Sequence, residues 1–552
     1  MSLHIHAVGP VPEDTVRVIQ AAFPRGHRWV RLRDTLGTIY DDETFASLFS
    51  PRGRPAEAPW RLALVTVLQC AEGLTDRQAA DAVRDRLSWK YLLGLELTDT
   101  GFDFSILSEF RTRLVEGSAE HVLLETFLDR CKGASLLKAR GRQRTDATHV
   151  LAAVRTLNRL ECVGETMRYA LNALAVVVPA WLRAQALPDW YDRYDVRIEN
   201  TRLPEAQTER DTLAATIGAD GLHLLAAVYG PAAPAWLREV PAIQTLRRVW
   251  VQYFYAPDIV GIVRLRDPQD MPPGDRTIES PYDTDVRYHT KRNTTWTGYT
   301  VHLTETCDED APHLITHVAT VPATTNDVEM TGAIQSDLAA RDLLPREHLL
   351  DAGYVSAERL VASMAREIDL VGPAPPDTSW QAKAGDGFGV AHVIIDWSGR
   401  SVTCPQGKRS RYWGEGTTEH GHPFHQVIFD KADCLACPCR THCTRSATRP
   451  RQLALRPREE HAALQVARQR QTTDEFTRRY KKRAGVEARC PKGSRHAGSR
   501  THATVGWPEH TCSMWRPVWR SAYSASTTGG RKHPARSRVP PGSPPWPLES
   551  PR

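Results

Sequence analysis

Two acidic residues in distant parts of the chain lie in settings that suit metal binding. Asp351 ends a short apolar segment, His-Leu-Leu-Asp-Ala-Gly-Tyr (348–354). Glu487 closes a second segment in which Tyr480, Arg483 and Glu487 are spaced i, i+3 and i+7, so a helix would place them on one stripe. A carboxylate at the end of a hydrophobic strand, with another on a polar helical stripe, is suited to hard divalent cations.

A third carboxylate, Asp146, lies upstream in Arg-Thr-Asp-Ala-Thr-His (144–149). Together with Asp351 and the Tyr-x2-Arg-x3-Glu segment that ends at Glu487, it resembles the DDE insertion-sequence transposases, specifically the group with a Tyr-x2-Arg-x3-Glu-x6-Lys signature. The resemblance covers residues 16–487. It implies that Asp146, Asp351 and Glu487 bind two Mg²⁺ (or Mn²⁺) ions at the scissile phosphate.

The same resemblance implies the function and the partners. We expect a transposase that binds the ends of a bacterial insertion sequence, cleaves phosphodiester bonds and transfers 3′ ends to target DNA. The partner is double-stranded DNA, bound by a homodimer, with Tyr480 and Arg483 contacting DNA near the cut. Two alternatives remain open: a DNA-binding remnant that does not cut, and a metal-dependent nuclease that performs no strand transfer.

Composition is that of a soluble globular protein, with 41% hydrophobic and 25% charged residues. No uninterrupted apolar run approaches the roughly 20 residues that span a bilayer, and no signal peptide opens the chain, so we expect a cytoplasmic protein on chromosomal DNA. The net charge of +6 is misleading, because residues 488–552 hold eleven of the 71 Lys and Arg but only two of the 65 Asp and Glu. The rest of the chain is therefore slightly acidic, and DNA affinity there requires local basic patches.

Residues 16–137, after a flexible N-terminus (1–15), are expected to form an all-helical DNA-binding domain. An apolar helix follows Pro59, a Gly-containing turn ends it, and Thr75 is a suitable N-cap for a helix over 76–87. This pattern resembles a helix-turn-helix that would present Arg77 and Arg84 to DNA. An ordinary helical hairpin with a solvated basic face is the alternative.

Residues 138–487 are expected to form an α/β catalytic domain with a ribonuclease-H-like mixed sheet. Period-two alternation over 299–304 predicts an amphipathic strand, and the unit strand 349–351, helix from Ser356, strand 368–371 predicts parallel pairing. Open sheets of this kind usually place their sites at the carboxyl ends of strands. A helical insertion is expected over 152–285.

A basic and aromatic cluster closes that insertion. It contains Arg287, Lys291 and Arg292, which we expect to contact phosphates and bases. A solvated loop remains the alternative.

A second insertion, residues 376–457, holds five of the eleven cysteines. Cys404, Cys434, Cys437 and Cys443 have spacings that allow one tetrahedral zinc, with Cys439 surplus and His442 a substitute ligand. The alternative is reduced thiols without metal.

The last segment changes character. Thr472-x-x-Glu475 is expected to cap a helix running over 474–487, and the likeness to transposases is expected to stop at Glu487. Residues 488–552 contain ten Pro, six Gly and one Leu, a composition typical of disorder. We interpret them as an out-of-frame tail created by a frameshift just after Glu487, with a genuine basic DNA-binding tail as the alternative.

Overall fold

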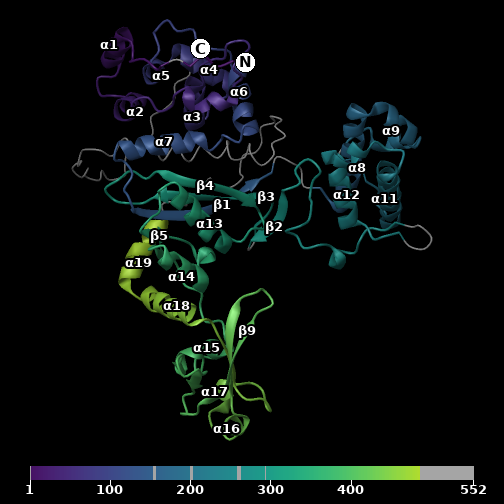
Figure 1. Cartoon of the computed structure of the whole chain (residues 1–552), viewed down its shortest axis with the longest axis vertical. Coiled ribbons are helices and arrows are strands. Elements are labelled where there is room, and N and C mark those ends of the chain that lie inside the picture. The colour runs from purple at the N-terminus through teal and green to yellow at the C-terminus, as the bar shows by residue number, and fades with distance from the viewer. Residues whose placement is uncertain are drawn as a thin grey trace, which may run out of the picture.

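The computed structural model describes residues 2–5, 7–152, 157–198, 203–257, 263–291 and 294–484. Two predicted site residues, Glu487 and Arg292, and the proposed tail lie outside these ranges. The chain begins with a helical region, which Figure 1 shows packed over a central sheet. Its helices are α1 (Glu13–Ala22), α2 (Arg28–Leu36), the 3-10 helix η1 (Glu43–Leu48), α3 (Pro59–Glu72), α4 (Asp76–Asp85), α5 (Leu87–Leu93), α6 (Ser105–Glu116) and α7 (Val122–Gly133).

The turn between α3 and α4 forms as the sequence predicts. Pro59 occupies the first turn of α3, and Gly73 ends that helix with a left-handed backbone, φ 71°. Thr75 then caps α4 through a reciprocal capping box with Gln78. The prediction of a flexible N-terminus is wrong for Ser2, which is buried and donates its backbone N–H to the Arg54 carbonyl at 2.8 Å.

The central sheet contains β1 (Arg142–Leu151), β2 (Arg287–Lys291), β3 (Thr294–Thr306), β4 (Ile315–Pro322), β5 (Glu347–Leu349) and β6 (Asp369–Val371). Its strand order is β2-β3-β1-β5-β6, and β4 also pairs with β3. Strands β2, β1 and β4 run antiparallel to β3, whereas β5 is parallel to β1 and β6 is parallel to β5. The predicted parallel unit is therefore confirmed, with α14 (Ala357–Ala365) between β5 and β6 and Ser356 as its N-cap.

Strand β3 is present, but both of its faces are buried, whereas an amphipathic strand with one solvated face was expected. Its polar residues Thr300, His302 and Thr304 are buried, as are the apolar residues that alternate with them. Several of these buried polar groups are hydrogen-bonded: Thr145 Oγ1 lies 2.7 Å from both Thr304 Oγ1 and His348 Nε2, and His302 Nδ1 lies 2.6 Å from the Tyr354 hydroxyl. A buried face built from hydrogen-bonding partners has the same period-two pattern as a solvated one.

The N-terminal helices and the sheet share one continuous core. The largest buried cluster joins Leu64, Leu68 and Phe110 of the helical region to Ile334 of α13 (Asp327–Ala340) and Tyr354 of the 3-10 helix η5 (Ala352–Tyr354). Polar contacts strengthen this packing, because Lys132 Nζ donates to the Arg341 carbonyl at 2.7 Å. The helical region is thus packed directly on the sheet (Figure 1).

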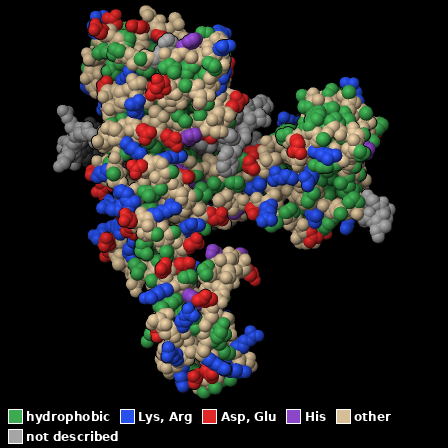
Figure 2. All heavy atoms as spheres, viewed as in Figure 1, with side chains coloured by type: hydrophobic (Ala, Val, Ile, Leu, Met, Phe, Trp, Pro, Cys, Tyr) green, Lys and Arg blue, Asp and Glu red, His purple; other side chains and the backbone are tan. Residues whose placement is uncertain are grey.

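Between β1 and β2 the chain forms a helical insertion with its own core, which projects to the right of the sheet in Figure 1. It comprises α8 (Arg159–Val177), α9 (Pro179–Gln185), α10 (Trp190–Tyr194), α11 (Gln207–Tyr229), the 3-10 helix η3 (Ala235–Glu239) and α12 (Pro241–Tyr253), with η4 (Pro268–Asp270) on the return. Figure 2 shows many hydrophobic side chains on its surface. Among described residues, α11 alone has the length and apolar composition of a membrane span, yet it packs on α8 and α12 as a core helix does.

The remaining residues form a Cys-rich region and two final helices. The Cys-rich region, at the bottom of Figure 1, contains α15 (Trp380–Ala384), η6 (Val390–His392), β7 (Ile394–Asp396), β8 (Ser401–Thr403), β9 (Ser410–Thr417), β10 (Pro423–Phe429), α16 (Lys431–Leu435), α17 (Arg440–Cys443) and β11 (Gln452–Leu455). The chain then returns to the central sheet through α18 (Arg458–Gln471), α19 (Asp474–Tyr480) and the 3-10 helix η7 (Lys481–Arg483).

Candidate active site

The register of two neighbouring parallel strands brings Asp146 and Asp351 to equivalent positions. Arg144 of β1 pairs with Leu349 of β5, and each aspartate lies two residues further along its own segment. Residues two apart on a strand share a face, so Asp146 lies on the face of Arg144. Asp351 lies two residues beyond the last residue of β5, at the carboxyl end of the strand, as the sequence predicts.

Helix α19 packs against the same face of the sheet. Phe476 joins Leu349, Val371 and Cys307 in a small buried cluster, and Tyr480 packs on it. The rings of Phe476 and Tyr480 stack with centroids 5.6 Å apart. Helix α19 therefore directs the segment after Tyr480 toward the two aspartates.

Arg483 completes this approach. Its Nη1 lies 3.2 Å from Oδ2 of Asp146, and both side chains are largely buried, with about 14% and 16% of each exposed. The guanidinium also lies over the Tyr480 ring, 5.6 Å from its centroid. Two of the three residues predicted on one helical stripe thus lie beside a predicted catalytic carboxylate.

The charges of both aspartates affect the pKa of the Tyr480 hydroxyl. Burial raises the pKa of Tyr480, Arg483 opposes the rise, and the charges of Asp351 and Asp146 add to it. Tyr480 is therefore a neutral hydroxyl at physiological pH, within electrostatic reach of both carboxylates.

Each aspartate also has a local backbone contact. Asp146 Oδ1 accepts the Ala147 N–H at 2.9 Å, and Asp351 Oδ1 accepts the N–H of Ala352. Among described residues, no group of three or more His, Cys, Asp or Glu side chains is arranged to hold a metal. Glu487, the predicted third carboxylate, lies beyond residue 484, where the description ends.

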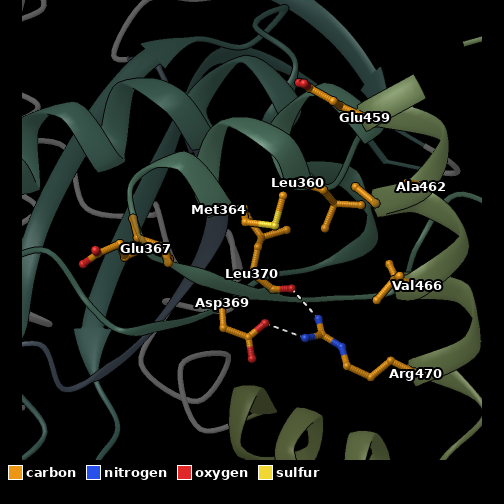
Figure 3. A pocket seen from close by; sticks show the side chains of 12 residues that line it. Leu360, Met364, Glu367, Asp369, Leu370, Glu459, Ala462, Val466 and Arg470 are labelled. Carbon is orange, nitrogen blue, oxygen red and sulfur yellow. Dashed lines mark hydrogen bonds and ion pairs between the residues drawn. The ribbon is translucent and has the colours of Figure 1, made fainter. Parts of the chain in front are cut away.

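A cluster of ion pairs fixes α19 to the sheet. Arg479 lies 3.2 Å from Oε2 of Glu347 in β5 and also contacts Asp369 in β6. Burial opposes ionisation of Asp369, but hydrogen bonds from Arg479 and Arg470 outweigh it and lower the pKa of that carboxyl. Figure 3 shows Arg470 bonded to Asp369 and to the Leu370 carbonyl, beside an apolar groove of about 560 Å³ between α14 and α18.

A second anchor lies beneath η7. Arg144 donates Nε to Glu305 at 3.0 Å and also donates to the Lys482 carbonyl, and both members of the ion pair are buried. Lys482 Nζ in turn lies 2.7 Å from Glu309. Sequence reasoning missed Arg144 and Arg479 as positioning residues. The available signal was the two-residue spacing of Arg144 from Asp146, which puts both on one strand face.

The helix that carries Tyr480 begins and ends differently from the prediction. Thr473, not Thr472, is its N-cap and accepts the Phe476 N–H at 3.2 Å. The α-helix ends at Tyr480 and continues as the 3-10 helix η7, so an unbroken α-helix to Glu487 is wrong. Because a 3-10 helix has three residues per turn, it changes the direction of side chains beyond Tyr480.

The arginines predicted to contact DNA from α4 differ in their surroundings. Arg77 is exposed and lies over the Phe104 ring, 4.2 Å from its centroid. Arg84 instead donates Nε to the Thr100 carbonyl at 2.8 Å and Nη2 to the Phe102 carbonyl at 3.3 Å. Asp81 is exposed on the same helix, so this surface carries both charges and is not a strongly basic patch.

The cluster that closes the helical insertion is only partly available to DNA. The prediction for Arg287 is wrong, because its side chain is buried and donates to the carbonyls of Asp275, Thr284 and Val286. Its donors hold the preceding loop together. Lys291 is about half exposed and lies 2.7 Å from Asp327.

The four cysteines predicted to bind zinc line one cavity of about 230 Å³ in the Cys-rich region. Cys439 and His442 do not line it.

Comparisons with protein families support a transposase. A family model described as Transposase domain (DUF772) matches residues 17–113, and one described as Transposase DDE domain matches residues 403–514. The first match falls within the N-terminal helices, and the second begins at the end of β8 and includes the rest of the Cys-rich region, α18 and α19. A DDE transposase domain indicates an enzyme family that cleaves DNA and transfers strands. No curated protein and no solved structure matches the chain.

The second match corrects one expectation. It continues through Glu487 to residue 514, so the likeness to transposases does not stop at Glu487. A frameshift placed immediately after Glu487 is not supported by this match.

Proposed function

We propose that this chain is a DDE transposase whose active site combines Asp146, Asp351 and Glu487. The observation that carries the proposal is the alignment of Asp146 and Asp351 on adjacent parallel strands, with Arg483 brought to Asp146 by α19. The order β4-β3-β1-β5-β6, with β3 antiparallel to β1 and with β1, β5 and β6 parallel, supports a ribonuclease-H-like arrangement. The Tyr-x2-Arg-x3-Glu spacing supports membership of the corresponding transposase group, although Ser494 stands where the signature has its Lys.

The donor set suits Mg²⁺ or Mn²⁺. Carboxylate oxygens are the ligands that these hard cations prefer, and the Arg483 guanidinium, 3.2 Å from Asp146 here, would leave that carboxylate when a metal binds. Asp146, Asp351 and Glu487 would hold the ions, which supply charge stabilisation to the attacked phosphate and lower the pKa of a bound nucleophile.

Arg483 and Tyr480 have complementary roles in this proposal. The planar guanidinium of Arg483 can move from Asp146 to a phosphate oxygen and bind it with two parallel hydrogen bonds. Tyr480 keeps its proton, because burial raises its pKa, and donates a hydrogen bond to the DNA backbone. The stacked Phe476 ring and the ion pairs of Arg479 hold Tyr480 in place.

DNA ends are recognised elsewhere in the chain. We propose that the α3–α4 unit contacts DNA through Arg77, and that Lys291 contacts the strand near the active site. Transposition joins two ends, so the working form is a homodimer on DNA.

Labelled duplexes from both flanks of the gene, incubated with the protein and Mg²⁺, test the proposed function. Joined products that carry the flanking end in a target duplex support transposition. Nicked but unjoined DNA indicates a nuclease, and a shifted but intact band indicates a DNA-binding remnant; either result contradicts the proposal.

A further inference from the structure

The Cys-rich region has a very small hydrophobic core. Its three-stranded sheet, β11-β10-β9, and the hairpin β7-β8 bury one cluster of five hydrophobic residues, Val402, Val427, Phe429, Leu453 and Leu455. Units of this size bury too little apolar surface to be stable on that basis alone, and usually require disulfides or a structural metal. All nine cysteines of the described ranges are free thiols.

Four of these thiols come together from three separate segments. Cys404 follows β8, Cys434 lies in α16, Cys437 follows α16, and Cys443 ends α17. All four line the cavity of about 230 Å³, and Cys404 and Cys434 also pack against the small core. One ligand in this cavity would join the β8–β9 turn to both short helices.

A closed turn holds the backbone at Cys404. The Gly407 N–H donates to the Cys404 carbonyl, and the Cys404 N–H donates to the Lys408 carbonyl, both at 2.9 Å. Gly407 has φ +74°, a left-handed conformation that residues with a Cβ rarely adopt. The turn therefore fixes the direction of the Cα–Cβ bond of Cys404 and leaves rotation about χ1 free.

The remaining candidate ligands face elsewhere. The Cys439 sulfur accepts a hydrogen bond from Gln406 Nε2 at 3.4 Å, and His442 Nδ1 lies 3.3 Å from Asp386. The geometry therefore separates Cys439 and His442 from the four cavity thiols.

A cationic side chain lies beside the four thiols, because Arg451 lines the same cavity. Arg451 is partly buried and donates to the Cys443 carbonyl. Four thiolates around a divalent ion carry a net charge of −2, which the Arg451 guanidinium partly neutralises.

We propose that Cys404, Cys434, Cys437 and Cys443 bind one structural Zn²⁺ that cross-links the Cys-rich region. Zinc takes four thiolates tetrahedrally with Zn–S distances of about 2.3 Å. The described side chains do not yet form such a shell, so rotation of the cysteines about χ1 accompanies binding. These soft ligands distinguish the zinc site from the carboxylate site on the central sheet. The proposal does not depend on transposase activity.

Metal analysis of the full chain, purified with a reductant and without chelator, tests this proposal. We expect about one zinc per chain in the parent and in the control Cys439→Ser, and its loss in Cys434→Ser and Cys443→Ser. Replacement by Co²⁺ in the parent gives a readout that needs no variant to fold: tetrathiolate coordination predicts intense visible d–d bands and sulfur-to-cobalt charge transfer.

Other results would overturn the proposal. Iron instead of zinc would assign a different metal centre to the same thiols. No metal after incubation of the reduced protein with Zn²⁺ would leave only free thiols. Loss of zinc from Cys439→Ser, with retention in Cys443→Ser, would show that the ligand set is wrong.

Discussion

Arg483 holds its guanidinium 3.2 Å from the carboxylate of Asp146, although the two residues are 337 positions apart in the chain. This contact depends on two independent anchors: Arg479 binds α19 to β5 and β6, and Arg144 binds the Lys482 carbonyl. The contact between Arg483 and Asp146 therefore depends on how α19 and η7 are positioned against the sheet that carries both aspartates.

Replacing either aspartate with asparagine should abolish cleavage and leave DNA binding nearly unchanged. Asp146→Asn and Asp351→Asn each remove a metal-binding charge without creating a cavity. Metal-assisted stabilisation is worth several kcal/mol, so we expect losses of about 1,000-fold or more. Gel-shift and cleavage assays on the same duplex measure both properties. Asp342→Asn, an exposed carboxylate outside the site, is the control. Cleavage at the parental rate in either site variant would refute the assignment.

Two substitutions at Arg483 should distinguish the contribution of its positive charge from that of its planar, bidentate guanidinium. Arg483→Ala should lower kcat by about 100-fold, the usual cost of losing one donor to developing charge. Arg483→Lys should recover part of this, because lysine keeps the charge but lacks the bidentate fork. Single-turnover cleavage measures the effect. Equal rates for Lys and Ala would show that charge at this position does not contribute.

Loosening α19 should impair catalysis without touching the predicted active-site carboxylates. Arg479→Ala breaks ion pairs with Glu347 and Asp369, and we expect a loss of about 1–3 kcal/mol in stability. A displacement near 1 Å at the site costs on the order of 100-fold in rate. The matched control is Arg478→Ala, an exposed arginine on the same helix. Identical melting temperatures and rates for the two variants would contradict the anchoring role.

Buried histidines should make the fold sensitive to acid. Burial lowers the pKa of His348 to about 3, and His317 adds to this shift. Burial also lowers the pKa of His302 to about 4, with Lys291 and His317 acting in the same direction and Asp327 opposing.

The sign of this effect follows from linkage. Because the unfolded histidines titrate near 6.5, the unfolded state binds more protons below that pH, and stability falls as pH decreases from about 6.5 toward 4. The loss is of order 2 kcal/mol per histidine at pH 5. Urea denaturation between pH 5 and 8 measures it. A flat profile would show that these histidines are already protonated in the fold or exposed.

Part of the candidate site could be predicted from the sequence, because the strand–helix–strand unit that contains Asp351 has a local pattern. The apolar run before Asp351 predicted a strand end, and the β5–α14–β6 unit fixed its parallel partners. Register then follows from pairing, since Arg144 opposite Leu349 aligns the two aspartates. The alternating pattern of β3 predicted the strand but not that its polar face is buried.

Features that depend on contacts between distant segments of the chain could not be predicted from the sequence. Arginine commonly contacts DNA, but the guanidinium of Arg287 donates its hydrogen bonds to carbonyl groups of the neighbouring loop. Only the folded loop brings these carbonyl groups close to Arg287. The cap is Thr473, one residue after the predicted Thr472, so the third helical position holds Phe476, which packs in the core, and not the Glu475 of the predicted capping box. The continuous core across residue 137 depends on contacts between segments far apart in sequence, which no local pattern specifies.

The most direct test of the account is to map the divalent cation on the protein itself. Fe²⁺ replaces Mg²⁺ at carboxylate sites, and with ascorbate and peroxide it generates hydroxyl radicals that cut the nearby backbone. We predict cleavage next to Asp146 and next to Asp351 in the same preparation, suppressed by excess Mg²⁺ and lost in Asp146→Asn. Cleavage that avoids both residues, or that persists unchanged in Asp146→Asn, would contradict a shared metal site at these two aspartates.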